Sequence, residues 1–374
     1  MRSHSGWRRL RLHRYFARKF AMTFLIVLVI FAAILALVDL MNQVGRYDVG
    51  QIGFASILGL TLLSTPEALY EFLPLAMILA SLALFLGLAR TSELVVTRAL
   101  GWSALRVILA PLAVSLVVGA LAVAVLNPVV TGLGHRYEAL TRKYQGVEET
   151  LLSIGADGLW LRQGTEDGQA VIHARSANHD GSDLQSVTFL MFDASGAPTE
   201  RIEAERAKLE DGFWHLKGAK DWLFAEFANP EAGAQRRDDM RIRTSLTPAR
   251  IASSAGTATS ISVWNLRAHI AQLERAGFST RRPLVWFQTE LARPLFLAVM
   301  VLIGAAFTMR HTRSGHTGLM VLFALLSGFA LFFIRNFALI LGESGQLPVV
   351  IAVWAPPLAG LLMALGLILH LEDG

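Results

Sequence analysis

Five charged side chains lie inside long apolar stretches of this 374-residue sequence. Glu67 and Glu71 are four residues apart, so they share one face of a helix, and Glu290 and Arg293 are three apart. Burying a charge in a bilayer costs about 2.5 kcal/mol or more on insertion scales, so each charge requires a reason. Together with Arg335, they either form a polar lining that meets a charged headgroup, or they form ion pairs between helices or snorkel to the interface. We favour ion pairing for Glu290 and Arg293.

A polar segment, Arg90–Gly101, separates two of the apolar stretches. Ser92 can cap a short helix, Glu93 lies in the first turn, where the helix dipole favours an anion, and Gly101 is placed to end it. This helix either enters a partner's groove or rests on the lipid surface, and the composition leaves both interpretations open. The residues assigned to the partner contact are Ser92, Glu93, Leu94, Val95, Arg98, Ala99 and Gly101, of which Leu94, Val95 and Ala99 would enter the groove.

The sequence carries none of the short motifs that would make this chain an enzyme by itself. It has no G-x-x-x-x-G-K-[ST] phosphate loop, no H-E-x-x-H and no G-x-S-x-G. Because it contains no cysteine, disulfides, thiolate metal sites and thiol nucleophiles are excluded. His173, His179 and His215 fall in one region, but their spacing does not require a metal. We therefore predict no catalytic residue, cofactor or metal, and we expect ATP hydrolysis in a partner chain.

The apolar stretches themselves indicate a membrane protein, since 53% of the residues are hydrophobic and only 17% are charged. An uncharged helix of about 20 residues crosses the hydrocarbon core of a bilayer. The second stretch contains Pro66 and Pro74, and we expect it to be kinked or to enter through a re-entrant turn. The six candidate spans are Phe20–Leu40, Phe54–Ala89, Ala104–Pro128, Leu284–Met309, Thr317–Leu341 and Pro348–His370.

The basic residues predict the orientation of these spans. Residues 1–19 contain seven basic side chains and no acidic one, and they adjoin an apolar run, which indicates a membrane surface and no nucleic-acid partner. That run has no A-x-A cleavage site, so it predicts a retained span and not a signal peptide. Segments 90–106 and 310–316 are also basic. The positive-inside rule then places both chain ends in the cytoplasm of a multi-pass inner-membrane protein and the segment between spans three and four outside.

The long segment after the third span has a different pattern, with short alternating runs and Asp-Gly pairs that are typical of hairpin turns. It predicts an antiparallel β-domain of about eight strands, and Val263–Gly277 predicts an amphipathic helix. Alternation assigns Trp160, Leu190, Phe192 and Phe224 to its interior, although a one-residue slip would reverse each. The predicted divisions are 1–134 with spans one to three, 135–260 for the β-domain, 261–282 for the connecting helix and 283–374 with spans four to six.

Several motifs along the whole chain resemble the permease subunits of the lipopolysaccharide export ABC transporter, and the G-type subunit more closely than its F-type partner. The most specific is Ser92-Glu-Leu-Val-Val96. The others are Leu37-Val-Asp-Leu40, Leu73-Pro-Leu-Ala76, Leu151-Leu-Ser153, Gly158-Leu-Trp160, Thr244-Ser-Leu-Thr-Pro248 and Ile261-Ser262.

The resemblance implies a periplasmic β jelly roll that is open along one side, and a coupling helix around Glu93 that docks into a cytoplasmic ATPase dimer. It also implies three further partners: a homologous F-type permease, a bitopic periplasmic bridge protein whose helix lies beside span one, and lipopolysaccharide. The residues expected to contact lipid are Arg46, Glu67, Glu71, Arg335, Trp160, Leu190, Phe192 and Phe224. Some relatives carry basic residues where this chain has Glu67. An alternative function is a mechanotransmitting membrane protein that regulates a periplasmic partner and moves no lipid.

Overall fold

The computed structural model of the chain describes residues 4–47, 52–145, 152–155, 158–165, 168–178, 181–193, 195–224, 230–244, 246–247, 251, 261–275, 279–309 and 317–373. It divides into a helical unit, residues 1–141 and 285–374, and an inserted unit, residues 142–284. The basic segment 310–316 and His179 lie outside the described residues.

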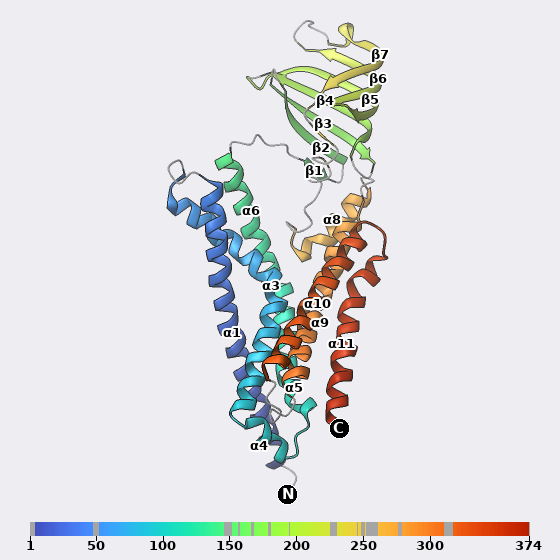
Figure 1. Ribbon diagram of the computed structural model, residues 1–374. Helices are drawn as coiled ribbons and strands as arrows, with labels where there is room; N and C mark the ends of the chain where they lie inside the picture. The colour runs from blue at the N-terminus through green and yellow to red at the C-terminus, as the bar shows by residue number, and fades with distance from the viewer. Residues whose placement is uncertain are drawn as a thin grey trace. The chain divides into compact units, whose positions relative to one another are not determined.

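The helical unit contains six helices that are long and apolar enough to cross a membrane, which confirms the predicted number of spans (Figure 1). The second span is one helix despite Pro66 and Pro74. The third continues through a five-residue π-helical segment, Ala122–Leu126, into α6. The helices are α1 (His4–Arg46), α3 (Phe54–Arg90), α4 (Glu93–Ala99), α5 (Ala104–Leu121), α6 (Asn127–Gln145), α9 (Arg281–Thr308), α10 (Thr317–Glu343) and α11 (Val349–Asp373).

The helix α6 corrects one predicted boundary. The sequence pattern assigns residues 135–145 to the β-domain, whereas they are helical in the structure and end at Gln145. The span prediction stops at Pro128 because polar residues follow it, but a helix does not have to end where its apolar part ends. The third helix therefore extends beyond the apolar stretch that predicted it.

The centre of the helical unit is formed by α3 and α9. In the most apolar window of each helix, 67% of the α3 residues and 78% of the α9 residues are buried, against 6% for α1. Small residues let the helices approach closely: a Cβ atom at Gly119 would lie 2.5 Å from the Cα of Pro294. The hydroxyl of Ser81 on α3 also donates to the Val301 carbonyl of α9 at 2.9 Å. Polar groups inside this unit are thus satisfied by neighbouring helices, as a bilayer requires.

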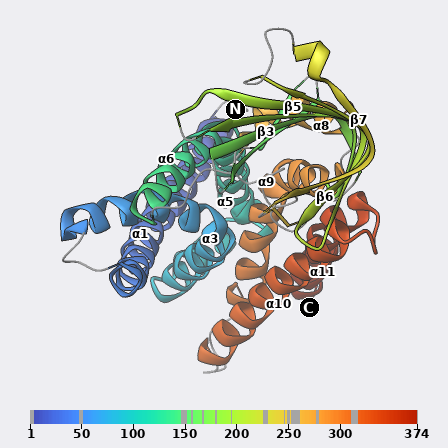
Figure 2. The same ribbon diagram turned by 90° about the horizontal axis from the view of Figure 1, so that it is seen from above.

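The inserted unit is built around an antiparallel sheet in which each strand pairs with the next, and Figure 2 shows that this sheet is curved. Asp211 and Gly212, with φ of 49° and 77°, turn β5 into β6, as the Asp-Gly pair predicts. The Thr244 hydroxyl, just after β7, donates to the side-chain amide oxygen of Gln163 on β2, so a hydrogen bond links these two parts of the curved sheet. The strands are β1 (Leu152–Gly155), β2 (Gly158–Thr165), β3 (Gly168–Ala177), β4 (Asp183–Asp193), β5 (Pro198–Glu210), β6 (Phe213–Leu223) and β7 (Gln235–Arg243).

The buried face of this sheet is one residue out of phase with the prediction. Phe189 is fully buried, whereas its neighbours Leu190 and Phe192 are only partly buried. The run 187–192 is apolar on nearly every residue, so alternation alone does not decide which face points inward. Trp160 is 42% exposed and packs against the His173 ring across the strand pair. Phe224 is partly buried just after β6.

Large side chains fill the inner side of the sheet. Leu159, Ile172, Phe189, Trp214 and Leu216 are each 0% exposed. Their cluster is completed by Leu246, Ile251 and Leu273, the last from the helix α8 (Val263–Arg275). The amphipathic helix is therefore confirmed, and its apolar face closes the core of the inserted unit.

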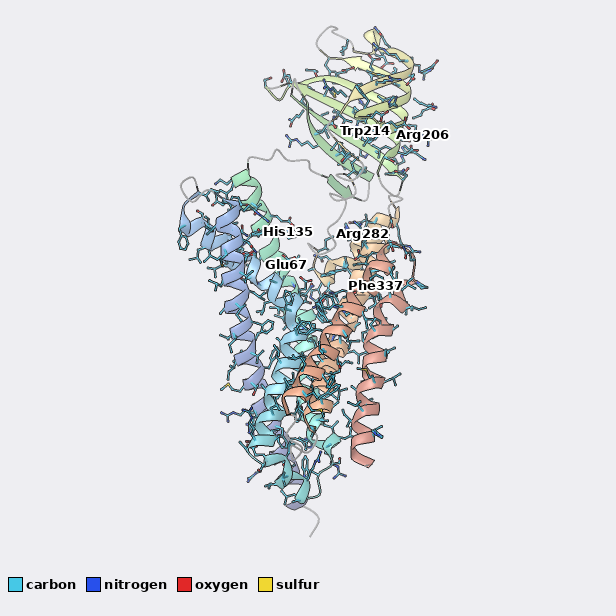
Figure 3. The ribbon with its side chains drawn as sticks, in the orientation of Figure 1. Glu67, His135, Arg206, Trp214, Arg282 and Phe337 are labelled. Carbon is cyan, nitrogen blue, oxygen red and sulfur yellow. The ribbon has the colours of Figure 1, made fainter. Side chains whose placement is uncertain are left out.

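Trp214, marked on the sheet in Figure 3, supplies a test of this filled core. Replacing it by alanine is expected to destabilise the inserted unit by about 3–5 kcal/mol, because the ring leaves a cavity. The exposed Trp160 is the matched control, and Trp160→Ala should have a much smaller effect. The measurement is the rate of limited proteolysis within residues 142–284 of the full-length chain in detergent. Equal rates for the two variants would contradict a filled interior.

Candidate functional site

The candidate site is centred on α4, the short helix between the second and third membrane helices. Gly101, with φ of +79°, follows its C-terminus, as the sequence predicts. Ser92 precedes its first residue but does not cap it as predicted, since its backbone is left-handed and its side chain makes no capping hydrogen bond. The start of α4 is instead stabilised through the side chain of Glu93.

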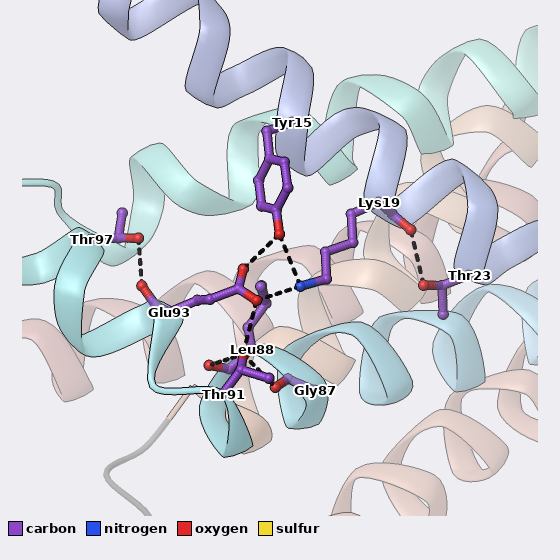
Figure 4. Close-up of polar contacts among 8 residues, drawn as sticks. All are labelled: Tyr15, Lys19, Thr23, Gly87, Leu88, Thr91, Glu93 and Thr97. Carbon is purple, nitrogen blue, oxygen red and sulfur yellow. Dashed lines mark hydrogen bonds and ion pairs between the residues drawn. The ribbon is translucent and has the colours of Figure 1, made fainter.

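Three donors, two from α1 and one from the turn before α4, converge on the Glu93 carboxylate (Figure 4). Lys19 Nζ on α1 lies 2.7 Å from Oε1, and the Tyr15 hydroxyl, one turn earlier, donates to Oε2 at 2.9 Å. The Thr91 hydroxyl donates to Oε1 at 2.9 Å. Burial alone would raise the pKa of the Glu93 carboxyl, but the hydrogen bonds from Lys19, Thr91 and Tyr15 outweigh it and lower that pKa. Glu93 is therefore an anion that links α4 to α1.

The other end of α4 is linked to a different membrane helix. Arg98 donates to the Met309 carbonyl, just after α9, at 3.2 Å. Between these contacts, Leu94 and Thr97 are buried, and Leu94 belongs to the core of the helical unit. Because α4 also connects α3 to α5 along the chain, it is attached to four of the membrane helices.

The exposed side of α4 is apolar. Val95 and Val96 are each 60% exposed and Leu100 is 70% exposed, and Ala99 is exposed beside them. The assignment of Leu94 to a partner's groove is wrong, because this side chain packs into its own chain. Val96 and Leu100 were missed, although their spacing of four residues places them on one helix face. An exposed apolar patch of this kind is typical of a binding surface.

A second polar cluster lies among the membrane helices. Arg293 on α9 pairs with Glu290 through two hydrogen bonds of 2.7 and 3.1 Å, and both side chains are buried. Arg293 also donates to the Tyr70 carbonyl at 3.2 Å, and the Tyr70 hydroxyl donates to Glu290. Glu290 and Arg293 therefore form an ion pair, but within α9 and not between helices as the prediction had it. Tyr70 was missed because nothing in the sequence relates it to a residue 220 positions away.

The remaining predicted lipid contacts in the helical unit do not form one cluster. Arg335 on α10 is only 9% exposed, and its guanidinium lies 4.7 Å from the centre of the Phe296 ring. Within the described residues, no carboxylate lies within 4 Å of it. Glu71 is close enough to interact electrostatically with Arg293 and Arg335. Glu67 and Glu71 on α3 and Arg46 in the last turn of α1 are exposed.

Six membrane-crossing helices with an antiparallel sheet inserted between the third and fourth define a polytopic membrane protein with an extramembrane domain. The chain belongs to a family of such proteins, described as the lipopolysaccharide export system permease LptF/LptG, whose model matches residues 14–370.

Two relatives cover nearly the whole chain. The lipopolysaccharide export system permease protein LptG of Escherichia coli (strain K12) is 25% identical over 346 residues, which is 91% of this chain and 89% of the relative. The protein of the same name from Haemophilus influenzae is 24% identical over 360 residues, with coverages of 93% and 94%. The resemblance to the G-type permeases is thereby confirmed, and the chain is a multi-pass inner-membrane permease.

The Glu290–Arg293 pair predicts a large stability effect. Arg293→Met leaves a buried carboxylate unpaired and is expected to destabilise the chain by about 3–5 kcal/mol. Adding Glu290→Gln should recover part of that loss, because the unpaired charge disappears. Arg282→Met, at an exposed position near the start of the same helix, is the matched control. The measurement is the midpoint of thermal unfolding in detergent, and equal midpoints for Arg293→Met and Arg282→Met would contradict the prediction.

Proposed function

We propose that this chain is the permease subunit of an ABC transporter that extracts lipopolysaccharide from the outer leaflet of the inner membrane and passes it to a periplasmic bridge. ATP is hydrolysed by a separate cytoplasmic dimer. The observation that carries the proposal is the exposed apolar face of α4, on a helix attached to α1 through Glu93 and to α9 through Arg98. A partner that moves α4 would therefore move the membrane helices. The relatives are named as lipopolysaccharide export permeases, which supports lipopolysaccharide as the substrate.

The proposed orientation places both termini and α4 in the cytoplasm and the inserted sheet in the periplasm. Arg11, Arg14 and Arg18 are exposed near the start of α1, and Arg90 and Arg106 are exposed on either side of α4. These cations favour the cytoplasmic side under the positive-inside rule.

In this proposal, Val95, Val96, Ala99 and Leu100 enter a groove of the ATPase dimer. ATP closure then displaces α4, and the helices of this chain and of a homologous F-type permease approach each other, squeezing the acyl chains between them. The lipid-exposed side of α1, which includes Ile26 over half exposed, is available to the single helix of a bitopic bridge protein.

Arg335 is the strongest candidate for a headgroup contact in the membrane. The residue is only 9% exposed, and an anion would offset the cost of holding its charge in a low-dielectric environment. Arg46 would supply a second positive charge at the end of α1. The acidic Glu67 and Glu71 fit a headgroup that has fewer phosphates or that carries positively charged groups.

A filled inserted unit favours the second candidate function, mechanotransmission to a periplasmic partner. The inner residues of the sheet are fully buried, so acyl chains would enter only if the sheet opened, for example at the Gln163–Thr244 contact. Photocrosslinking in cells separates the two functions, with a probe at Arg46, at Val96 or at Phe189. Lipopolysaccharide captured at Arg46 and Phe189 together with an ATPase at Val96 would support transport. An ATPase at Val96 with only protein partners at the other two positions would support mechanotransmission.

The exposed apolar face of α4 makes a separate prediction. Val95→Asp combined with Val96→Asp places two charges on the apolar face and is expected to reduce ATPase affinity at least tenfold, because burying each valine is worth about 1.5–3 kcal/mol. The measurement is the amount of ATPase that is recovered with the tagged permease. Val95→Ile combined with Val96→Ile keeps the face apolar and serves as the control. Unchanged recovery of the ATPase with the aspartate variant would remove this surface from the proposal.

A further inference from the structure

The first membrane helix has polar attachments at its two ends, and one side of it is exposed between them. Near the start, Phe16, Phe20 and Phe24 are buried in the core of the helical unit, on the turns that carry Tyr15 and Lys19. Between the ends, Leu25, Ile26, Val29 and Ile30 are all more than half exposed, as are Ile34, Leu37 and Met41.

The far end of α1 has its own polar attachments. The Ser64 hydroxyl of α3 donates to the Asp39 carboxylate at 2.6 Å. The Gln43 amide donates to the Tyr137 hydroxyl of α6 at 2.8 Å. Since α1 is unbroken from His4 to Arg46, and a helix rises 1.5 Å per residue, about 36 Å separate Lys19 from Gln43. A displacement of the Lys19 end is therefore carried across the thickness of a membrane.

We propose that Lys19 and Tyr15 are positioning residues that hold Glu93 and so make α1 move together with α4. This inference deepens the proposed function and rests on it, because α4 moves only if a partner drives it. Lys19 and Tyr15 contact opposite oxygens of one carboxylate, and Lys19 also donates to the Tyr15 hydroxyl at 3.2 Å. Two charge-assisted hydrogen bonds to both oxygens fix the orientation of the carboxylate as well as its position.

The position of this contact on α4 decides what it transmits. Glu93 is the first residue of α4, whereas Arg98, in the last turn, binds the end of α9. The two ends of α4 are thus attached to two different membrane helices. A rotation or tilt of α4 pulls α1 relative to α9, which apolar packing by Phe16 and Phe20 alone would not do with a defined direction.

The absence of cysteine from the sequence makes a direct test simple. Met41→Cys is introduced at the far end of α1, where the side chain is 69% exposed. In the assembled complex with its ATPase, the rate of modification by a thiol reagent is compared without nucleotide and after trapping with ATP and vanadate. We expect the two rates to differ several-fold in the parent. In Lys19→Gln combined with Tyr15→Phe, they should differ less than twofold while ATPase recovery stays unchanged.

Three variants separate this role from a purely structural one. Arg18→Gln, at the exposed neighbour of Lys19, should keep the parent's difference. Lys19→Arg, with Tyr15 unchanged, should also keep the parent's difference between the two rates, because a guanidinium also binds a carboxylate. Tyr15→Phe, which removes the hydroxyl's hydrogen bonds with Glu93 and Lys19 and keeps the ring, should reduce the difference part-way, even if the double variant does not assemble.

The possible failures are distinguishable. A parent-like difference in the double variant, or in Tyr15→Phe when the double variant does not assemble, overturns this inference. The inference is also overturned if the parent complex assembles but the rate of thiol modification at Met41→Cys is the same with and without trapped nucleotide. Failure of the parent chain to recover any ATPase instead overturns the proposed function.

Discussion

A bilayer cannot solvate polar groups, and this constraint explains most of the arrangement of the helical unit. Glu290 and Arg293 neutralise each other one helical turn apart, and Tyr70 on α3 adds two contacts: its hydroxyl donates to Glu290 and its carbonyl accepts from Arg293. The Ser81 hydroxyl likewise donates to a carbonyl of α9. Because the contacts of Tyr70 and Ser81 join α3 to α9, the two helices form the buried centre, and the other spans can remain exposed to lipid or to partner helices. Arg335 is buried and has no carboxylate within 4 Å among the described residues. It is therefore the position in this unit at which an anionic ligand would be most stabilising.

The two sides of the short helix α4 differ for a related reason. A helix of seven residues is too short to be stable alone, so it depends on contacts with the rest of the chain. Its buried side supplies them through Leu94 and Thr97, and its charged residues at the two ends reach α1 and α9. Its exposed side is then free to be apolar. A permease that receives mechanical work needs both properties, a surface that binds and attachments that transmit.

The inserted unit is stabilised differently, by a core that it builds without disulfides. The helix α8 completes that core with Leu273, which explains why the connection back to the membrane helices is amphipathic. A hydrogen bond between the side chains of Gln163 and Thr244 links the second strand to the end of the last.

The sequence alone determined the features that depend on local chemistry. Apolar length predicts the six spans, the Asp211-Gly212 pair predicts its hairpin, and polar residues ending in Gly101 predict the position of α4. Alternation did not decide which face of β4 is buried, because both faces carry apolar side chains. Only the tertiary structure decided that Glu93 binds Lys19, 74 positions away, and that Tyr70 binds Glu290. Periodicity reports which side of an element is apolar, whereas the partner of a polar side chain is set by how distant helices pack.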